Sequence, residues 1–200
     1  MLLGLLHSGV KCYFQMNPVS SSSTCASAML RGQLENVLTS GTLQIMKHPP
    51  SVMIWGAMLV TGTAGLFFLP NGMTMNGQKY IDLLKDKLKL HMNVHNCNIF
   101  MQDGTPYHRS KIVSEFLKEK KIKVLNWPGN SPDLNPIENL WEVLKNKVAD
   151  KQPSSAKHLK DAIKEVWICE LSSAYCRTLV ESMPRRLEMV IKNNGGHTKY

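Results

Sequence analysis

Apolar and polar positions change their period along this 200-residue chain, and the changes mark a succession of strands and helices. Residues 52–69 carry no charge and contain two apolar runs around a segment rich in Thr and Gly, which predicts a β-hairpin. A helix is expected from Asn76 to Leu90, because Tyr80, Leu84 and Leu88 recur at helical spacing and Asn76 can cap the first turn.

The middle of the chain predicts a strand, a helix and a second strand with short connections. A strand is expected over Cys97–Gln102, an amphipathic helix over Ser110–Lys120 and a short strand over Lys123–Trp127. This order is typical of a right-handed crossover, which places the two strands parallel in one sheet. Ligands gather at the carboxyl ends of such strands, and Asp103 lies there, directly after the first one.

A loop rich in Pro and Asn then leads into a helix, with Asn135 expected as its N-cap and Pro136 at its first position. Glu138 lies in the first turn, where the helix dipole stabilises a carboxylate. Glu142, one turn later, is a competing acidic residue. Further helices are expected around Leu159–Trp167 and Tyr175–Met183, with a last one over Pro184–Lys192.

The first forty residues differ from the rest, since they show no sustained period of either kind and include the run Ser20–Ser23. Residues 1–41 are therefore predicted to be a poorly ordered extension, followed by a folded domain over residues 42–200. Glu35 is the only acidic residue before Asp82, so the N-terminal side offers almost no carboxylate.

The net charge of +9 and the pI near 9.4 favour a polyanionic partner, although plain solubility explains the same charge. A membrane span is the alternative for residues 52–69, because 18 uncharged residues reach the lower length limit. Three glycines and neighbouring threonines interrupt this segment and favour the hairpin, so no membrane partner is expected.

Four segments carry a resemblance to a known family. They are SVMIWG at 51–56, MQDGTPYH at 101–108, WPGNSPDLNPIENLW at 127–141 and SMPRR at 182–186. In this order they strongly resemble the catalytic domain of Tc/mariner superfamily transposases, with the likeness running from about Thr42 to Tyr200. The resemblance implies an α/β, RNase H-like fold, a mixed sheet flanked by helices, and a nuclear DNA-cutting and DNA-joining enzyme that uses Mg²⁺ or Mn²⁺.

In that family two Asp residues and one Glu hold two metal ions. By motif position, Asp103 resembles the second Asp and Glu138 the Glu, with 34 residues between them, and His108 resembles a residue that positions the site. The first Asp and its strand have no counterpart here, so the sheet is expected to lack its first strand and catalysis to be impaired. The family's N-terminal helix-turn-helix region has no counterpart either.

Two functions remain open on this basis. The first is a transposon-derived, nucleic-acid-binding protein that resembles a Mg²⁺-dependent endonuclease. The alternative is a non-catalytic interaction protein, or an unstable relic, that binds DNA or intact transposase, and homo-oligomers are a further possibility. DNA contacts are expected from a cluster of four lysines, Lys118, Lys120, Lys121 and Lys123. Exposure to solvent at the end of a helix explains these charges equally well. A zinc site at His91, His95 and Cys97 is a weak alternative, because three ligands fit no standard finger.

Overall fold

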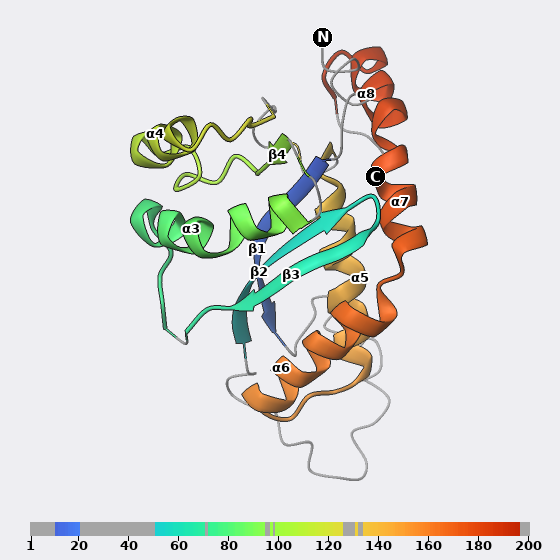
Figure 1. Cartoon of the computed structure of the whole chain (residues 1–200). Coiled ribbons are helices and arrows are strands. Elements are labelled where there is room, and N and C mark those ends of the chain that lie inside the picture. Colours follow the sequence, from blue (N-terminus) through green and yellow to red (C-terminus); the bar gives the residue numbers. More distant parts are fainter. Residues whose placement is uncertain are drawn as a thin grey trace.

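Four strands of the described chain form one mixed sheet, in the order β3-β2-β1-β4 (Figure 1). The computed structural model describes residues 11–20 as a strand, together with residues 51–70, 72–94, 97, 99–125, 131 and 134–196. The strands are β1 (Lys11–Ser20), β2 (Ser51–Leu59), β3 (Gly62–Phe68) and β4 (Ile99–Met101). β2 is antiparallel to both β1 and β3, whereas β4 runs parallel to β1.

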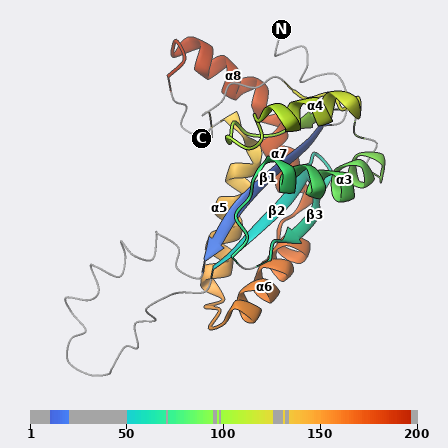
Figure 2. The same cartoon turned by 90° about the vertical axis from the view of Figure 1, so that its left-hand side faces the viewer.

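Helices cover both faces of this sheet, as Figures 1 and 2 show. On one face α3 (Gly77–Val94) and α4 (Lys111–Glu119) share an apolar cluster with Trp55 of β2 and Phe100 of β4. On the other face α5 (Pro136–Asp150), α6 (Ala156–Glu165), the π-helix η2 (Val166–Glu170) and α7 (Ser173–Glu181) share a cluster with Ile54 and Met101. The last helix is α8 (Met183–Lys192). These layers confirm the predicted α/β fold class.

Most predicted elements of the sheet and its connections are present. β2 and β3 form the expected hairpin, with Leu59 paired to Gly62 across a two-residue turn. Asn76 caps α3 through its Oδ1, which accepts a hydrogen bond of 2.9 Å from the backbone N of Lys79, and α3 continues four residues beyond the predicted end. The predicted second strand of the crossover is present as an isolated parallel bridge between Phe100 and Val124. The crossover therefore has the parallel arrangement that the sequence predicted.

β1 corrects the expectation that residues 1–41 form no ordered element and leave the sheet without its first strand. β1 pairs through Tyr13–Ser20 with β2 and through Lys11–Tyr13 with β4, so it lies between these strands. Sequence reasoning missed a short alternation here, in which apolar Cys12, Phe14 and Met16 are separated by Gln15 and other more polar residues, and Pro18 is unusual inside a sheet. Pro18 lies beyond the stretch that pairs with β4, which reduces the cost of its missing N–H.

The face covered by α5 is closed by two buried indoles. Trp141 of α5 and Trp167 of η2 stack with their ring centroids 5.0 Å apart, and both are almost fully buried. Both tryptophans therefore belong to the core. The indole Nε1 of Trp167 donates a hydrogen bond of 2.8 Å to the carbonyl oxygen of Ala64, which ties η2 to β3.

No helix in the described part of the chain is long and apolar enough to cross a membrane. The uncharged segment that raised this possibility forms the β2–β3 hairpin instead.

Candidate functional site

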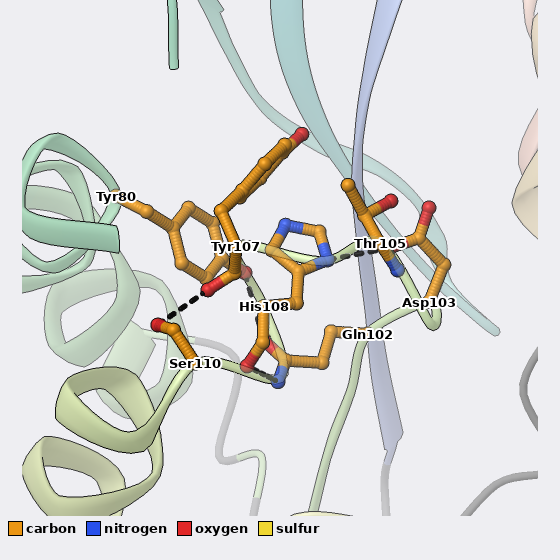
Figure 3. A network of polar contacts seen from close by, with 7 residues as sticks. All are labelled: Tyr80, Gln102, Asp103, Thr105, Tyr107, His108 and Ser110. Atoms are coloured by element: carbon orange, nitrogen blue, oxygen red, sulfur yellow. Dashed lines mark hydrogen bonds and ion pairs between the residues drawn. The ribbon is translucent and has the colours of Figure 1, made fainter. Parts of the chain in front are cut away.

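Asp103 lies two residues beyond β4, where the chain leaves the sheet. Its carboxylate is about one quarter exposed, and its Oδ1 accepts hydrogen bonds from the backbone N of Thr105 at 3.0 Å and from the ring of His108 at 2.5 Å (Figure 3). The turn is closed by the backbone N of His108, which donates to the carbonyl oxygen of Thr105 at 2.9 Å. Asp103 is therefore held in one orientation at the carboxyl end of a strand, as its sequence position predicted.

His108 is buried between two tyrosines, with only 1% of its side chain exposed. Its ring centroid lies 4.2 Å from that of Tyr80 and 4.5 Å from that of Tyr107. A second chain of hydrogen bonds fixes its backbone, because the Tyr80 hydroxyl donates to Gln102 and the Gln102 amide donates to the His108 carbonyl oxygen. The ring can turn little in this packing, so its Nδ1 stays directed at Asp103 (Figure 3).

The electrostatic surroundings favour an ionised Asp103. Burial alone would raise its pKa, but the hydrogen bond and charge of His108 and the N–H of Thr105 outweigh it and hold the pKa of Asp103 below its usual value. Burial and the nearby Asp103 charge raise the pKa of Tyr107 to about 12 and that of Tyr80 well above its ordinary value. At neutral pH the site therefore holds a carboxylate beside two protonated tyrosines.

Glu138 lies in the first turn of α5 and is partly exposed. The preceding residue, Ile137, is fully buried in the cluster that also contains Met101, two residues before Asp103. The two acidic residues thus flank the same apolar cluster, at the end of β4 and at the start of α5. Glu142, the competing acidic residue, is exposed.

The start of α5 is also held by α8. Arg186 is 1% exposed, and its guanidinium donates hydrogen bonds of 2.8 Å to Oδ1 of Asn139 and to Oγ of Ser182. Because Asn139 directly follows Glu138, this contact fixes the turn that carries the acidic residue. It gives a physical role to the SMPRR segment, whose second arginine is Arg186.

The backbone register relates β1 to this region. The parallel pairing of β1 with β4 ends at Tyr13 and Met101, so Gln15 and Asp103 each lie two residues beyond the last pair. Gln15 also pairs with Gly56 of β2, which lies against Trp141 and Trp167. No acidic residue occurs between Lys11 and Ser20. The strand that lies beside Asp103 therefore contributes no carboxylate.

The donor set suits a hard divalent cation in kind, since carboxylate oxygens are the ligands that Mg²⁺ and Mn²⁺ prefer. It falls short in number, because the described residues contain no group of three or more His, Cys, Asp and Glu that could hold a metal ion. The residues therefore do not fit the two-metal site that the resemblance implies. Of the weak zinc alternative, His95 lies outside the described residues.

The four lysines expected to contact DNA lie in different surroundings. Lys118 lines a cavity that Asp103 and His108 also line. Lys120 forms an ion pair of 2.7 Å with Glu119, whereas Lys121 and Lys123 are exposed and line no part of that cavity. The structure thus brings one of the four lysines to the candidate site.

Sequence reasoning missed several residues of the site. Tyr80 entered the sequence analysis only through its helical spacing, and only the folded chain brings its hydroxyl to Gln102. Arg109 lines the cavity and follows a segment that carries the family resemblance, so its position next to His108 was the available signal.

Three comparisons place these features among known proteins. Residues 32–160 match the family described as DDE superfamily endonuclease. The chain is 35% identical to the transposable element Tcb2 transposase of Caenorhabditis briggsae over 79% of its length, and 32% identical to the Tc1 transposase of Caenorhabditis elegans over 75%. It covers 58% and 55% of those two proteins, so it spans little more than half the length of the curated relatives it matches.

Solved structures agree with the fold. The Mos1 transposase catalytic domain with raltegravir and Mg superposes with a TM-score of 0.74 at 16% identity, covering 99% of this chain and 92% of that one. The Mos1 mariner paired end complex with Mn superposes with a TM-score of 0.78 at 17% identity, covering 99% and 60%. These likenesses show the same RNase H-like architecture that the sheet order indicates.

Proposed function

This chain belongs to the DDE superfamily endonuclease family, and from that premise we propose that it is a transposase-derived, nucleic-acid-binding domain with impaired cutting chemistry. The observation that carries the proposal is the composition of β1. This strand lies beside the strand that leads into Asp103, yet it contains no acidic residue, and Gln15 is the residue two positions beyond its last pairing with β4.

The balance between metal-ion and carboxylate charges explains why the lack of an acidic residue in β1 matters. Two divalent cations bring four positive charges, and Asp103 with Glu138 offsets two of them. An amide at position 15 offers a neutral oxygen but no charge, so it compensates poorly for a carboxylate. Loss of a ligand is expected to cost more than loss of a residue that orients one, which itself costs about 10 to 100-fold in metal affinity or activity. Asp103, Glu138 and His108 form the inherited site in this proposal, and Mg²⁺ or Mn²⁺ is the cofactor that the family resemblance implies for a complete site, which these residues alone do not form.

DNA is the proposed partner. The net charge of +9 supports this, since each neutralised phosphate releases counterions and adds salt-sensitive affinity. Mos1 transposase, whose fold this chain shares, is described in paired end complexes with transposon ends. A protein with this function acts in the nucleus and can associate with copies of itself or with an intact transposase.

The experiment is a pair of assays on the purified chain. Duplex binding is measured at several salt concentrations, and plasmid nicking is measured in Mg²⁺ and Mn²⁺ beside Asp103→Asn and Glu138→Gln. We expect salt-dependent binding in all three proteins and little or no nicking in any. Efficient nicking that both substitutions abolish would contradict the impairment, and absence of DNA binding by the folded chain would contradict the proposed partner.

The non-catalytic alternative differs in its partner. A chain that fails to bind duplex DNA but forms a stable complex with an intact transposase would support an interaction protein. Size-exclusion chromatography of the two proteins together separates these outcomes.

A further inference from the structure

A cavity of about 550 Å³ opens beside Asp103, between the end of β4, the turn that follows it, α4 and the segment after α4. Its polar lining comes from Gln102, Asp103, His108, Arg109, Ser114 and Lys118. Leu117 and Leu125, both buried, form part of its apolar floor. A space of this size is within the range of pockets that hold a small ligand or part of a larger one.

Two cationic side chains stand at this cavity without a described acidic partner. Arg109 and Lys118 are exposed, and neither forms an ion pair with any residue that the structure describes. Other lysines of the same helix region are compensated, since Lys111 pairs with Glu115 and Lys120 pairs with Glu119. Positive charge is therefore available at the cavity while it is offset on the remaining surface of α4.

The spacing on α4 adds a neutral hydrogen-bond donor to the same wall. Ser114 and Lys118 are four residues apart, so they lie one above the other on one face of the helix. Arg109 lies in the turn just before α4 begins at Lys111. The three side chains thus border the cavity from two elements, with a guanidinium, a hydroxyl and an ammonium as donors.

We propose that this cavity binds the phosphodiester backbone of one DNA strand, with Arg109 and Lys118 contacting phosphates beside Asp103. The proposal rests on the DNA-binding function proposed above and names the residues that hold the strand. A small free anion gains little here, because the Asp103 carboxylate offsets one of the two cations. A strand places separate phosphates at Arg109 and Lys118 and leaves its sugars over the apolar floor.

The test begins with affinity. Binding of a fluorescent duplex is measured by anisotropy at several salt concentrations for Arg109→Gln, Lys118→Gln and the matched control Lys120→Gln, which removes the same charge from a residue that pairs with Glu119. Arg109→Gln and Lys118→Gln are expected to weaken binding by about threefold or more and each to reduce the salt slope by about one. Lys120→Gln is expected to change affinity by less than about twofold, as for a screened surface pair.

Cross-linking then locates the strand. Ser114→Cys lines the cavity, whereas Glu115→Cys is its exposed neighbour on α4, turned by about 100°. Both are made with Cys169→Ser, which removes an exposed thiol, and are mixed with DNA that carries a thiol tethered to one phosphate. Preferential cross-linking of Ser114→Cys supports the proposal.

Two negative results have different meanings. Equal cross-linking at both positions, or equal affinity losses for all three charge variants, would show a diffuse positive field and would overturn the cavity assignment alone. A wild-type chain that binds no DNA at any salt concentration would overturn the proposed function together with it.

Discussion

Gly56 lies where the sheet meets the two stacked indoles, and Gly56→Ala is predicted to destabilise the fold strongly. A Cβ at position 56 would lie 2.5 Å from Cη2 of Trp141 and 2.8 Å from Cη2 of Trp167. Carbon atoms in contact are separated by about 3.5 to 4.0 Å, so each ring would have to withdraw by roughly 1 Å. Both rings are buried and stacked on each other, so neither has free space into which it can move.

Overpacking of a filled core costs about 1 to 3 kcal/mol, and two rigid rings place this variant at the upper end, about 3 kcal/mol. For a domain of this size each kcal/mol lowers Tm by about 2 to 4 °C, so a fall of roughly 6 to 12 °C is expected. Trp141 lies one turn after Glu138 in α5, so displacement of its ring also shifts the start of that helix. The variant thus connects core packing to the candidate site.

Urea unfolding of four proteins tests this reasoning: wild type, Gly56→Ala, Trp167→Phe and the double variant. Phenylalanine lacks the Cη2 atom that the new methyl group would meet, so Gly56→Ala is expected to cost at least about 1 kcal/mol less in the Trp167→Phe background. A cost below about 0.5 kcal/mol in the wild type, or identical costs in both backgrounds, would refute the steric argument.

Two further predictions concern the residues around the acidic groups. His108→Ala removes the hydrogen bond and charge that lower the pKa of Asp103 but retains most of its burial, so that pKa should rise. In the wild type the ionised Asp103 stabilises the fold above its unfolded pKa of about 3.9, and this stability disappears as pH falls through the lower folded pKa. His108→Ala should lose this stability at a higher pH than the wild type does. Carboxyl NMR titration and urea unfolding from pH 3 to 7 measure the change. An unchanged Asp103 titration would contradict the assignment of His108 as the cause of the lowered pKa. Arg186→Met keeps the apolar stem but leaves Asn139 and Ser182 without their donor, at an expected cost of about 1 to 3 kcal/mol in urea unfolding. A variant as stable as wild type would show that these hydrogen bonds contribute nothing.

The local elements around the site could be predicted because their signals are local. A polar residue after an apolar run predicted Asp103 at a strand end, and Asn135 with Pro136 predicted the helix that begins before Glu138. The cap of α3 at Asn76 was predicted for the same reason, since its side chain reaches only three residues ahead.

β1 could not be predicted in this way, since its structure depends on partners distant in sequence. The alternation of apolar and polar residues within residues 12–17 is short, and the place of β1 in the sheet is set by the pairing of Tyr13 with Met58 and Met101. The contacts that fix the site are also long-range. Tyr80 reaches Gln102 across 22 positions and Arg186 reaches Asn139 across 47, so sequence spacing alone gave no sign of either.

Metal affinity at position 15 tests the central claim most directly. Calorimetric titration with Mn²⁺ compares the wild type with Gln15→Asp, which places a carboxylate two residues beyond the last pairing of β1 with β4, and with Asn17→Asp, which adds the same charge two residues further along β1. We predict weak binding by the wild type, affinity at least about tenfold higher for Gln15→Asp, and no gain for Asn17→Asp. Tight binding by the wild type, or equal gains from both substitutions, would contradict the claim that the residue at position 15 limits this site.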